Sequence, residues 1–163
     1  MTKLKIVTEK EVDLLCRLAK EIWEEHYVKM IGQAQVDFML EKFHSKEIIL
    51  TGINQGDLWA ILWENENPLG YLMLQLSTDK IYLSKIYLKK ASRGKAYGKL
   101  MMDFVKDYAI EKGKSAIYLN VNKQNTASIA FYEKYGFTKS GEGVFEIGNG
   151  FVMDDFIYEL KLD

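Results

Sequence analysis

Hydrophobic and polar positions at the start of the chain first alternate and then change to a helical period. Leu4 and Ile6 alternate with polar neighbours, so we expect a strand over Lys3–Val7. Thr8 and Glu11 have the spacing of a capping box, in which each residue satisfies a backbone donor at a helix start. The pattern therefore predicts that the strand passes directly into a helix.

Three helical segments are predicted before the pattern changes again. The first runs from about Glu9 to about His26, because apolar residues recur there at every third or fourth position. These residues are Leu14, Leu15, Leu18, Ile22 and Trp23. Gly32 separates this helix from a second amphipathic segment, whose apolar residues are Val36, Phe38, Met39, Leu40 and Phe43. A short third helix is predicted over Ser45–Gln55.

The middle of the chain has the aromatic and branched residues of strands. Leu58–Glu64 and Leu69–Leu76 are separated by polar residues, which predicts a β-hairpin with Pro68 in its turn. A second polar turn leads to Lys80–Leu88, so three consecutive strands form an antiparallel meander. Gly70 marks a point where another backbone passes closely or the strand bulges.

A helix and a strand follow the meander. One apolar face predicts a helix from about Tyr97 to Lys112, and Gly113 suits its C-terminal cap. The face consists of Leu100, Met101, Phe104, Val105, Tyr108 and Ala109. Ala116–Val121 is the next strand. Strand, helix and strand in this order imply a right-handed crossover and parallel pairing, which puts the turn before the helix at the carboxyl ends of the strands, where ligands bind.

Composition limits the organisation and the partners of the protein. With 163 residues and 48% hydrophobic content, the chain suits a single domain over residues 1–163. Its 22 basic and 23 acidic residues give a net charge of −1, so we expect no general attraction to nucleic acid or to an anionic membrane. Any anion site must be local, and both a monomer and a homodimer agree with this composition.

The cysteine and histidine content argues against disulfide and metal chemistry. Cys16 is the lone cysteine, so the chain has no internal disulfide and we expect a soluble, cytoplasmic protein. Cys16 lies inside the first helix without a histidine or cysteine partner, which favours a structural role over a nucleophile. His26 and His44, the two histidines, lack the companions of a metal site, so we expect no metal.

The turn Arg93-Gly94-Lys95-Ala96-Tyr97-Gly98-Lys99 is the first candidate site. It opens the helix that follows the meander, and a helix N-terminus has free N–H groups and a positive dipole end. Glycine lets an anion approach that backbone, and the basic side chains add charge. These features predict a phosphate-binding turn.

Two common phosphate motifs do not fit this turn. A triphosphate loop needs four residues between its first glycine and Gly-Lys-Ser/Thr, whereas three separate Gly94 from Gly98 and Leu100 follows the lysine. A dinucleotide turn needs its first two glycines one residue apart, but Ala96 holds that position.

A second motif, Asn125–Phe137, identifies the cofactor when it is taken together with the first. The pair resembles the GCN5-related N-acetyltransferase (GNAT) superfamily, whose acetyl-CoA turn reads Arg/Gln-x-x-Gly/Ala-x-Gly/Ala and whose later helix reads Asn-x-x-Ala-x-x-Phe-Tyr-x-x-x-Gly-Phe. Ala96 replaces the commoner glycine and Ser128 the usual alanine, but both are small enough to let the cofactor approach. The resemblance implies a mixed α/β fold: a mostly antiparallel sheet of about seven strands with one splayed parallel pair and helices on both faces.

The resemblance also implies an acetyl-CoA site. The turn presents N–H groups to the pyrophosphate, the splayed strand edge and Asn125 bind the pantetheine arm, and Lys134 meets a phosphate. The implied contacts are Ile86, Tyr87, Leu88, Arg93, Gly94, Lys95, Ala96, Tyr97, Gly98, Lys99, Asn125, Ser128 and Lys134.

Tyr132 is the candidate catalytic residue. When an amine attacks the thioester a thiolate leaves, and a hydroxyl beside the sulfur can donate a proton or a hydrogen bond to it. The amine must also lose a proton, because only its neutral form attacks. Glu24, Glu25 or a bound water are options for that base, and the sequence does not decide among them.

The acceptor is predicted to be a small cationic amine. Trp23, Glu24 and Tyr27 can bind such an amine through charge and ring faces, although the acidic residues equally suit a solvated helix rim. The chain also resembles bacterial polyamine (spermidine/spermine) N-acetyltransferases of the PaiA type, but Ser84 stands where those proteins carry a glutamate. Alternatives are acetylation of a protein N-terminus or an amino acid, and an acyl-CoA sensor without turnover.

Overall fold

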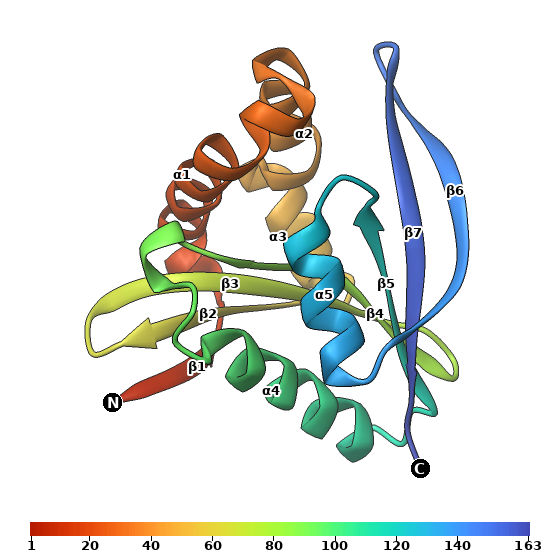
Figure 1. Ribbon diagram of the computed structural model, residues 1–163. Helices are drawn as coiled ribbons and strands as arrows, with labels where there is room; N and C mark the ends of the chain where they lie inside the picture. The colour runs from red at the N-terminus through yellow and green to blue at the C-terminus, as the bar shows by residue number, and fades with distance from the viewer.

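All seven strands belong to one mixed sheet in the computed structural model, which describes residues 1–163 (Figure 1). The strand order is β1-β2-β3-β4-β5-β7-β6, and every neighbouring pair is antiparallel except β4 and β5. The strands are β1 (Thr2–Ile6), β2 (Leu58–Glu64), β3 (Asn67–Leu76), β4 (Lys80–Leu88), β5 (Ala116–Asn122), β6 (Thr138–Gly148) and β7 (Phe151–Lys161). The predicted mixed sheet with one parallel pair is confirmed.

Five α-helices cover the two faces of this sheet. They are α1 (Val12–Ile31), α2 (Gln33–His44), α3 (Lys46–Asn54), α4 (Tyr97–Glu111) and α5 (Thr126–Tyr135), with short 3₁₀ turns η1 (Glu9–Glu11) and η2 (Lys90–Ser92). Helices α1, α2 and α3 lie on one side, and α4 and α5 lie on the other (Figure 1). None of them is long and apolar enough to cross a membrane.

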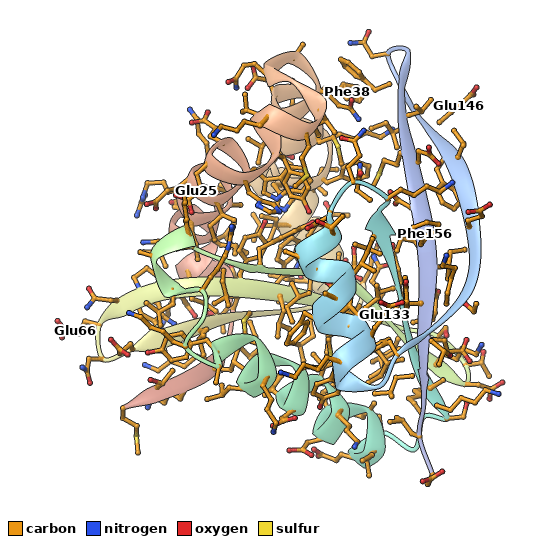
Figure 2. The ribbon with its side chains drawn as sticks, in the orientation of Figure 1. Glu25, Phe38, Glu66, Glu133, Glu146 and Phe156 are labelled. Carbon is orange, nitrogen blue, oxygen red and sulfur yellow. The ribbon has the colours of Figure 1, made fainter.

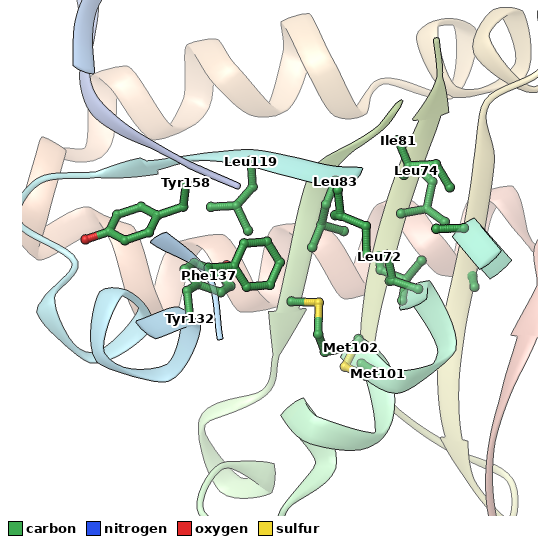
Figure 3. Close-up of a cluster of buried hydrophobic side chains, with 14 of the residues drawn as sticks. Leu72, Leu74, Ile81, Leu83, Met101, Met102, Leu119, Tyr132, Phe137 and Tyr158 are labelled. Atoms are coloured by element: carbon green, nitrogen blue, oxygen red, sulfur yellow. The ribbon is translucent and has the colours of Figure 1, made fainter. Parts of the chain in front are cut away.

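The two faces of the central strands explain the two hydrophobic cores. On β2, Ala60 and Leu62 pack under α4 and α5, while Trp59 and Ile61 pack under the N-terminal helices. Adjacent side chains of a strand point to opposite faces, so a strand covered on both faces is apolar throughout. Figure 3 shows the first core, where Leu72 lies close to Met101.

The predicted capping box of Thr8 and Glu11 is present, but it caps the 3₁₀ turn η1, and α1 itself begins only at Val12. At the start of α3, the Ser45 hydroxyl accepts a hydrogen bond from the Ile48 N–H at 3.3 Å. The predicted end of the first helix at His26 is wrong, because α1 continues to Ile31. The reason is local, since the backbone first leaves the helical conformation at Gly32, where φ is +87°.

Pro68 is not in the hairpin turn. It lies in β3 opposite Trp63, at a point where the register shifts, and the turn is made by Asn65 and Glu66 (Figure 2). Asn65 has a φ of +55°, a conformation that asparagine tolerates. A proline is accommodated at such an irregularity because a bulge relieves the ladder of one N–H donor.

A bulge in β4 reverses the direction in which its side chains point. Leu83 pairs with Leu74 whereas Lys85 pairs with Met73, so Ser84 is the extra residue. Before the bulge Leu83 packs in the core under α4, and after it Tyr87 packs against the core under α1.

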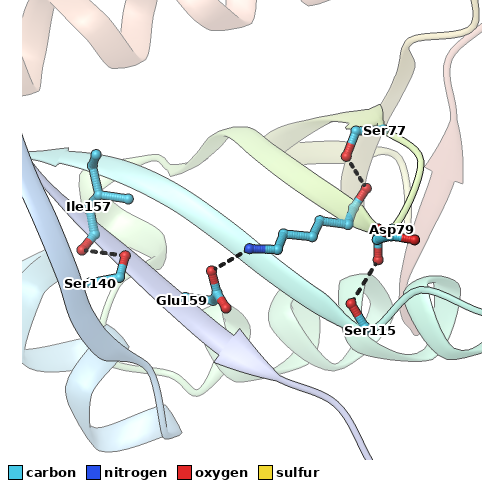
Figure 4. Close-up of polar contacts among 7 residues, drawn as sticks. Ser77, Asp79, Ser115, Ser140, Ile157 and Glu159 are labelled. Atoms are coloured by element: carbon cyan, nitrogen blue, oxygen red, sulfur yellow. Dashed lines mark hydrogen bonds and ion pairs between the residues drawn. The ribbon is translucent and has the colours of Figure 1, made fainter.

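The parallel pair β4–β5 is closed at one end and open at the other. Its pairing stops at Tyr82 and Tyr118, so the strands separate toward their carboxyl ends. At the closed end the Ser115 hydroxyl donates to the Asp79 carbonyl at 3.1 Å, and Lys80 forms an ion pair with Glu159 at 2.9 Å (Figure 4). The open end provides unpaired strand edges inside the protein.

Candidate active site

A groove of about 870 Å³ follows the open end of β4, the turn before α4 and one side of α5. Most of the residues predicted to bind acetyl-CoA line it: Ile86, Tyr87, Leu88, Arg93, Gly94, Ala96, Gly98, Lys99, Ser128 and Lys134. Lys95 and Tyr97 do not line it. The Tyr97 hydroxyl instead donates to the carboxylate of Glu64 on β2.

The turn before α4 has an unusual backbone. Gly94 has a φ of +77°, and Ala96, which caps α4, has a φ of +65°. An alanine in the left-handed region costs on the order of 1 kcal/mol, and such conformations concentrate at functional sites. Gly98 lies in the first turn of the helix, where an added Cβ would be 3.2 Å from the Phe131 ring. The turn is therefore shaped by its backbone and by close packing on α5.

The basic side chains of the turn have separate local partners. Arg93 donates to the Leu88 carbonyl at 3.2 Å, and Lys99 pairs with Asp103 at 2.9 Å. Both side chains remain exposed to solvent, and such surface pairs contribute little to stability. The charges are thus free to meet a phosphate at the groove.

A second, smaller cavity of about 80 Å³ occupies the split between β4 and β5. Helices α1, α2 and α5 and strand β7 complete its walls. Four residues line both the cavity and the groove: Ile86, Tyr87, Ser128 and Tyr132. The two spaces meet at these side chains, and we call the smaller one the acceptor pocket.

Tyr132 lies at this junction. It is buried, with 7% of its surface exposed, and its ring packs edge-on against Phe131 with centroids 5.7 Å apart. Burial, with a smaller contribution from Tyr27, raises the pKa of the Tyr132 phenol well above its usual value. The hydroxyl therefore stays protonated at neutral pH and can act as a hydrogen-bond donor.

Asn125 lines the acceptor pocket and not the groove. Its side chain caps α5 by accepting a hydrogen bond from the Ser128 N–H at 3.3 Å, and its amide nitrogen is 3.4 Å from His26 Nε2. His26 lines the groove, which the sequence did not indicate. Burial, followed by the charge of Arg93, lowers the pKa of His26, so the ring is neutral at pH 7.

Trp23 and Tyr27 line the acceptor pocket, whereas Glu24 does not. Glu24 is exposed, and Glu25 accepts a hydrogen bond from the Lys90 N–H beside the turn before α4 (Figure 2). Neither carboxylate is thus placed to serve as the base that the sequence left open.

A buried chain of hydrogen bonds holds Trp23 in place. Its Nε1–H donates to the Tyr71 hydroxyl at 2.8 Å, and that hydroxyl is 2.9 Å from His44 Nε2. Because an indole N–H can only donate, the Tyr71 oxygen accepts from Trp23, and its own proton is available to His44 Nε2 when that nitrogen is unprotonated. Burial, followed by the charge of Lys85, lowers the pKa of His44 well below its usual value, which agrees with a neutral acceptor ring.

Lys85 is a buried lysine that the sequence did not single out. Its ammonium donates to the Ser84 hydroxyl at 3.1 Å and lies 5.3 Å from the centroid of the Trp59 ring. Burial lowers its pKa to about 8, and the charge of Asp57 acts in the opposite direction. Lys85 lies beside the acceptor pocket, which Ser84 lines, but does not itself line it.

Asp155, on β7, also lines the acceptor pocket and was missed by sequence reasoning. It is fully buried, and neither carboxylate oxygen has a hydrogen-bond partner within the chain. Burial and neighbouring Asp154 raise its pKa to about 6, against a smaller lowering by Lys123. One signal was available in the sequence. Asp155 is two positions from apolar Met153 and from apolar Ile157, so it shares their face of the strand.

Two other reactive residue types are accounted for structurally. Cys16 is half-buried, its thiol donates to the His44 carbonyl at 3.4 Å, and burial raises its pKa. No group of three or more histidine, cysteine or acidic side chains is placed to hold a metal ion.

Residues 16–137 match the model of the acetyltransferase (GNAT) family. The chain is 25% identical over 132 residues to spermidine N(1)-acetyltransferase of Thermoplasma acidophilum, which covers 78% of this chain and 82% of that protein. It is 24% identical over 125 residues to peptidyl-lysine N-acetyltransferase YjaB of Salmonella typhimurium, with 75% and 80% covered.

The fold has a close counterpart among solved structures. The PaiA N-acetyltransferase of Thermoplasma acidophilum, crystallised in complex with coenzyme A, superimposes with a TM-score of 0.85. The match covers 99% of both chains at 23% sequence identity. The chain therefore shares the fold of this PaiA N-acetyltransferase, and its sequence is similar to a spermidine acetyltransferase from the same organism.

Proposed function

Because the chain belongs to the acetyltransferase (GNAT) family, we propose that it transfers the acetyl group of acetyl-CoA to a small cationic primary amine. The transfer proceeds by direct attack of the amine in a ternary complex. The observation that carries the proposal is the meeting of the groove with the acceptor pocket at Tyr132, in the split between β4 and β5. A thioester lying in the groove would end where a second molecule can approach it.

The groove would hold the cofactor largely through the backbone. Its volume of about 870 Å³ is ample for a large cofactor, and the N-terminus of α4 offers free N–H groups and a positive dipole end to the pyrophosphate. Gly94 and Gly98 keep the approach clear, and Arg93 and Lys99 add charge. The unpaired edge of β4 from Leu83 to Leu88 would bind the pantetheine arm in the manner of an added strand.

Tyr132 would stabilise the leaving thiolate. As the amine nitrogen bonds to the carbonyl carbon, the carbon–sulfur bond breaks and negative charge develops on sulfur. A thiol has a pKa of about 8.5, whereas that of Tyr132 is raised above the usual value of about 10. Donation of a hydrogen bond is therefore favourable, while full proton transfer is not, and the thiolate takes its proton from solvent after release.

The acceptor pocket favours an amine on a narrow aliphatic stem. Its volume of about 80 Å³ admits only a few atoms, and Trp23, Tyr27 and Tyr87 supply aromatic walls. Ring faces attract cations, which suits an ammonium group. Similarity to a spermidine acetyltransferase supports a polyamine end, and similarity to a peptidyl-lysine acetyltransferase supports a lysine side chain, which has the same aliphatic amine. We expect the protein in the reducing cytoplasm, where it would meet both polyamines and lysine side chains.

A thiol-release assay with acetyl-CoA tests this proposal. The panel contains spermidine, putrescine, butylamine and free amino acids. It also contains a peptide with one unacetylated lysine and a peptide whose only amine is its N-terminus. We expect turnover with the aliphatic amines and mass-spectrometric detection of the acetylated product. Acetyl-CoA binding in calorimetry without thiol release from any amine would favour the sensor alternative and refute the transferase.

A further inference from the structure

The carboxylate of Asp155 makes no hydrogen bond that would stabilise the fold. It is fully buried on β7, between β5 and the edge strand β6, and both of its oxygens lack partners within the chain. An unpaired buried carboxylate is costly, and protein interiors almost always satisfy such groups. Asp154, by contrast, is exposed and pairs with Lys123 at 3.0 Å. The two adjacent acids therefore have different roles.

Asp155 lines the same small pocket as Tyr132. Eleven hydrophobic residues and six uncharged polar residues form the remaining walls, so Asp155 is the one acidic side chain among them. A carboxylate in such surroundings interacts strongly with a cation that enters and displaces water, because little solvent screens the pair.

We propose that Asp155 binds the ammonium group of the acceptor amine and takes a proton from it, so that the neutral amine attacks acetyl-CoA. This inference rests on the proposed acetyl transfer and names the substrate class of that site: an unbranched primary alkylamine whose stem lies among the apolar walls. Asp155 is thereby the base that Glu24 and Glu25 are not placed to be.

The proton and electron balance of the step is complete. Asp155 first takes one proton from the bound ammonium and passes it to solvent, which frees the nitrogen lone pair. The lone pair forms the bond to the carbonyl carbon, and the carbon–sulfur pair leaves as thiolate next to Tyr132. The nitrogen becomes more acidic as this bond forms, so its second proton passes to the Asp155 carboxylate and then to solvent, while the thiolate takes one proton from solvent. No further reactant is required.

Titratable groups from several elements surround Asp155 and contribute to its pH dependence. They are Asp154 on β7, Lys123 in the loop after β5, Glu142 on β6, Tyr27 on α1, Tyr82 on β4 and Tyr132 on α5. The three tyrosines have raised pKa values and are neutral at pH 7, and Lys123 is already paired with Asp154 and Glu142. Asp155 is therefore the group in the pocket that titrates near pH 6.

The test compares Asp155→Asn with Asp154→Asn, a neighbouring change of the same kind. With saturating acetyl-CoA and varied butylamine or spermidine, Asp155→Asn should lower kcat/KM by at least about 100-fold, in the range of general base catalysis. Calorimetry should give an acetyl-CoA Kd within about twofold of the wild type for both variants. Asp154→Asn should keep kcat/KM within about threefold.

The pH profile separates a base from a residue that merely shapes the pocket. In the wild type, kcat/KM should fall through an acid limb near pH 6, which Asp154→Asn retains and Asp155→Asn lacks. Turnover by Asp155→Asn within about threefold of wild type, or an unchanged acid limb, would overturn this inference and leave the transferase proposal intact. Loss of acetyl-CoA binding in Asp155→Asn would indicate a structural role and also overturn it. Absence of turnover by the wild type with every amine would refute both proposals.

Discussion

The cofactor groove and the acceptor pocket meet at Tyr132, but they are built in different ways. Most of the groove comes from one continuous part of the chain, from Ile86 on β4 to Lys106 on α4, with α5 closing it. The pocket takes its walls from six elements that are distant in sequence: α1, α2, β4, β5, α5 and β7. A site made by the backbone of one turn leaves a local motif in the sequence, and a site made by side chains from many elements leaves none.

The two regions also differ in their electrostatics. The groove has exposed basic side chains, Arg93 and Lys99, in contact with solvent. The pocket encloses one carboxylate, Asp155. Burial and the charge of Asp154 raise its pKa to about 6, although the charge of Lys123 lowers it. Exposed charges attract a phosphate and hardly lower the stability of the fold. The buried charge lowers that stability through its lost hydration, and binding of a cationic substrate would offset this loss.

The largest effect is expected from Gly98→Glu, which changes the groove alone. The added carboxylate would stand at the N-terminus of α4 and repel the pyrophosphate, so acetyl-CoA affinity should fall by more than about 100-fold. Calorimetry measures the affinity, and circular dichroism checks that the variant is folded.

Gly98→Ala is the matched control for this change. Its Cβ would be 3.2 Å from the Phe131 ring, so a shift of a few tenths of an ångström accommodates it. Acetyl-CoA affinity should stay within about fivefold of wild type. Equal losses in both variants would indicate that packing on α5, and not charge, explains the effect.

Tyr132→Phe tests the junction between the two regions. Without the hydroxyl, kcat should fall by about 100-fold, while the acetyl-CoA Kd stays within about twofold, because the ring packing is kept. Steady-state thiol release and calorimetry separate the two quantities. An unchanged kcat would remove Tyr132 from the chemistry.

Tyr71→Phe should disturb the pocket and spare the groove. It removes the oxygen that accepts from Trp23 and the proton that is available to His44, which leaves buried polar groups unpaired. We expect a loss of about 1–3 kcal/mol in the free energy of unfolding and a higher KM for the amine. Tyr108→Phe, on the opposite face of the sheet, is the control and should change neither. A raised acetyl-CoA Kd in Tyr71→Phe would contradict the separation of the two regions.

The smallest effect concerns stability and not activity. Because folding raises the pKa of Asp155 from about 4 to about 6, the folded state holds the proton more tightly, and its stability falls as pH rises through this window. Asp155→Asn lacks this loss and should be more stable than wild type at pH 8, by about 1–3 kcal/mol, with a smaller difference at pH 4.5. Thermal unfolding at the two pH values measures it. A less stable variant at pH 8 would mean that the carboxylate has a structural partner.

Local chemistry in the sequence determined much of the fold. The period-two and helical patterns placed the meander and the helices, and Thr8, Ser45 and Gly113 stand at helix ends as their capping chemistry predicts. The errors were local as well. Pro68 enters β3 at a register shift of its pairing with β2, and α1 runs past His26 until Gly32 ends it.

The sequence by itself also determined the cofactor turn, since glycines and basic residues at a helix start act through the backbone next to them. Only the tertiary structure decided the acceptor pocket. The bulge at Ser84 turned Tyr87 toward α1, and the end of pairing at Tyr82 opened the split. Burial then left Asp155, one acid among 23 in the sequence, without a partner beside Tyr132. A carboxylate acquires such a role from its surroundings, which come from elements that the sequence does not place next to one another.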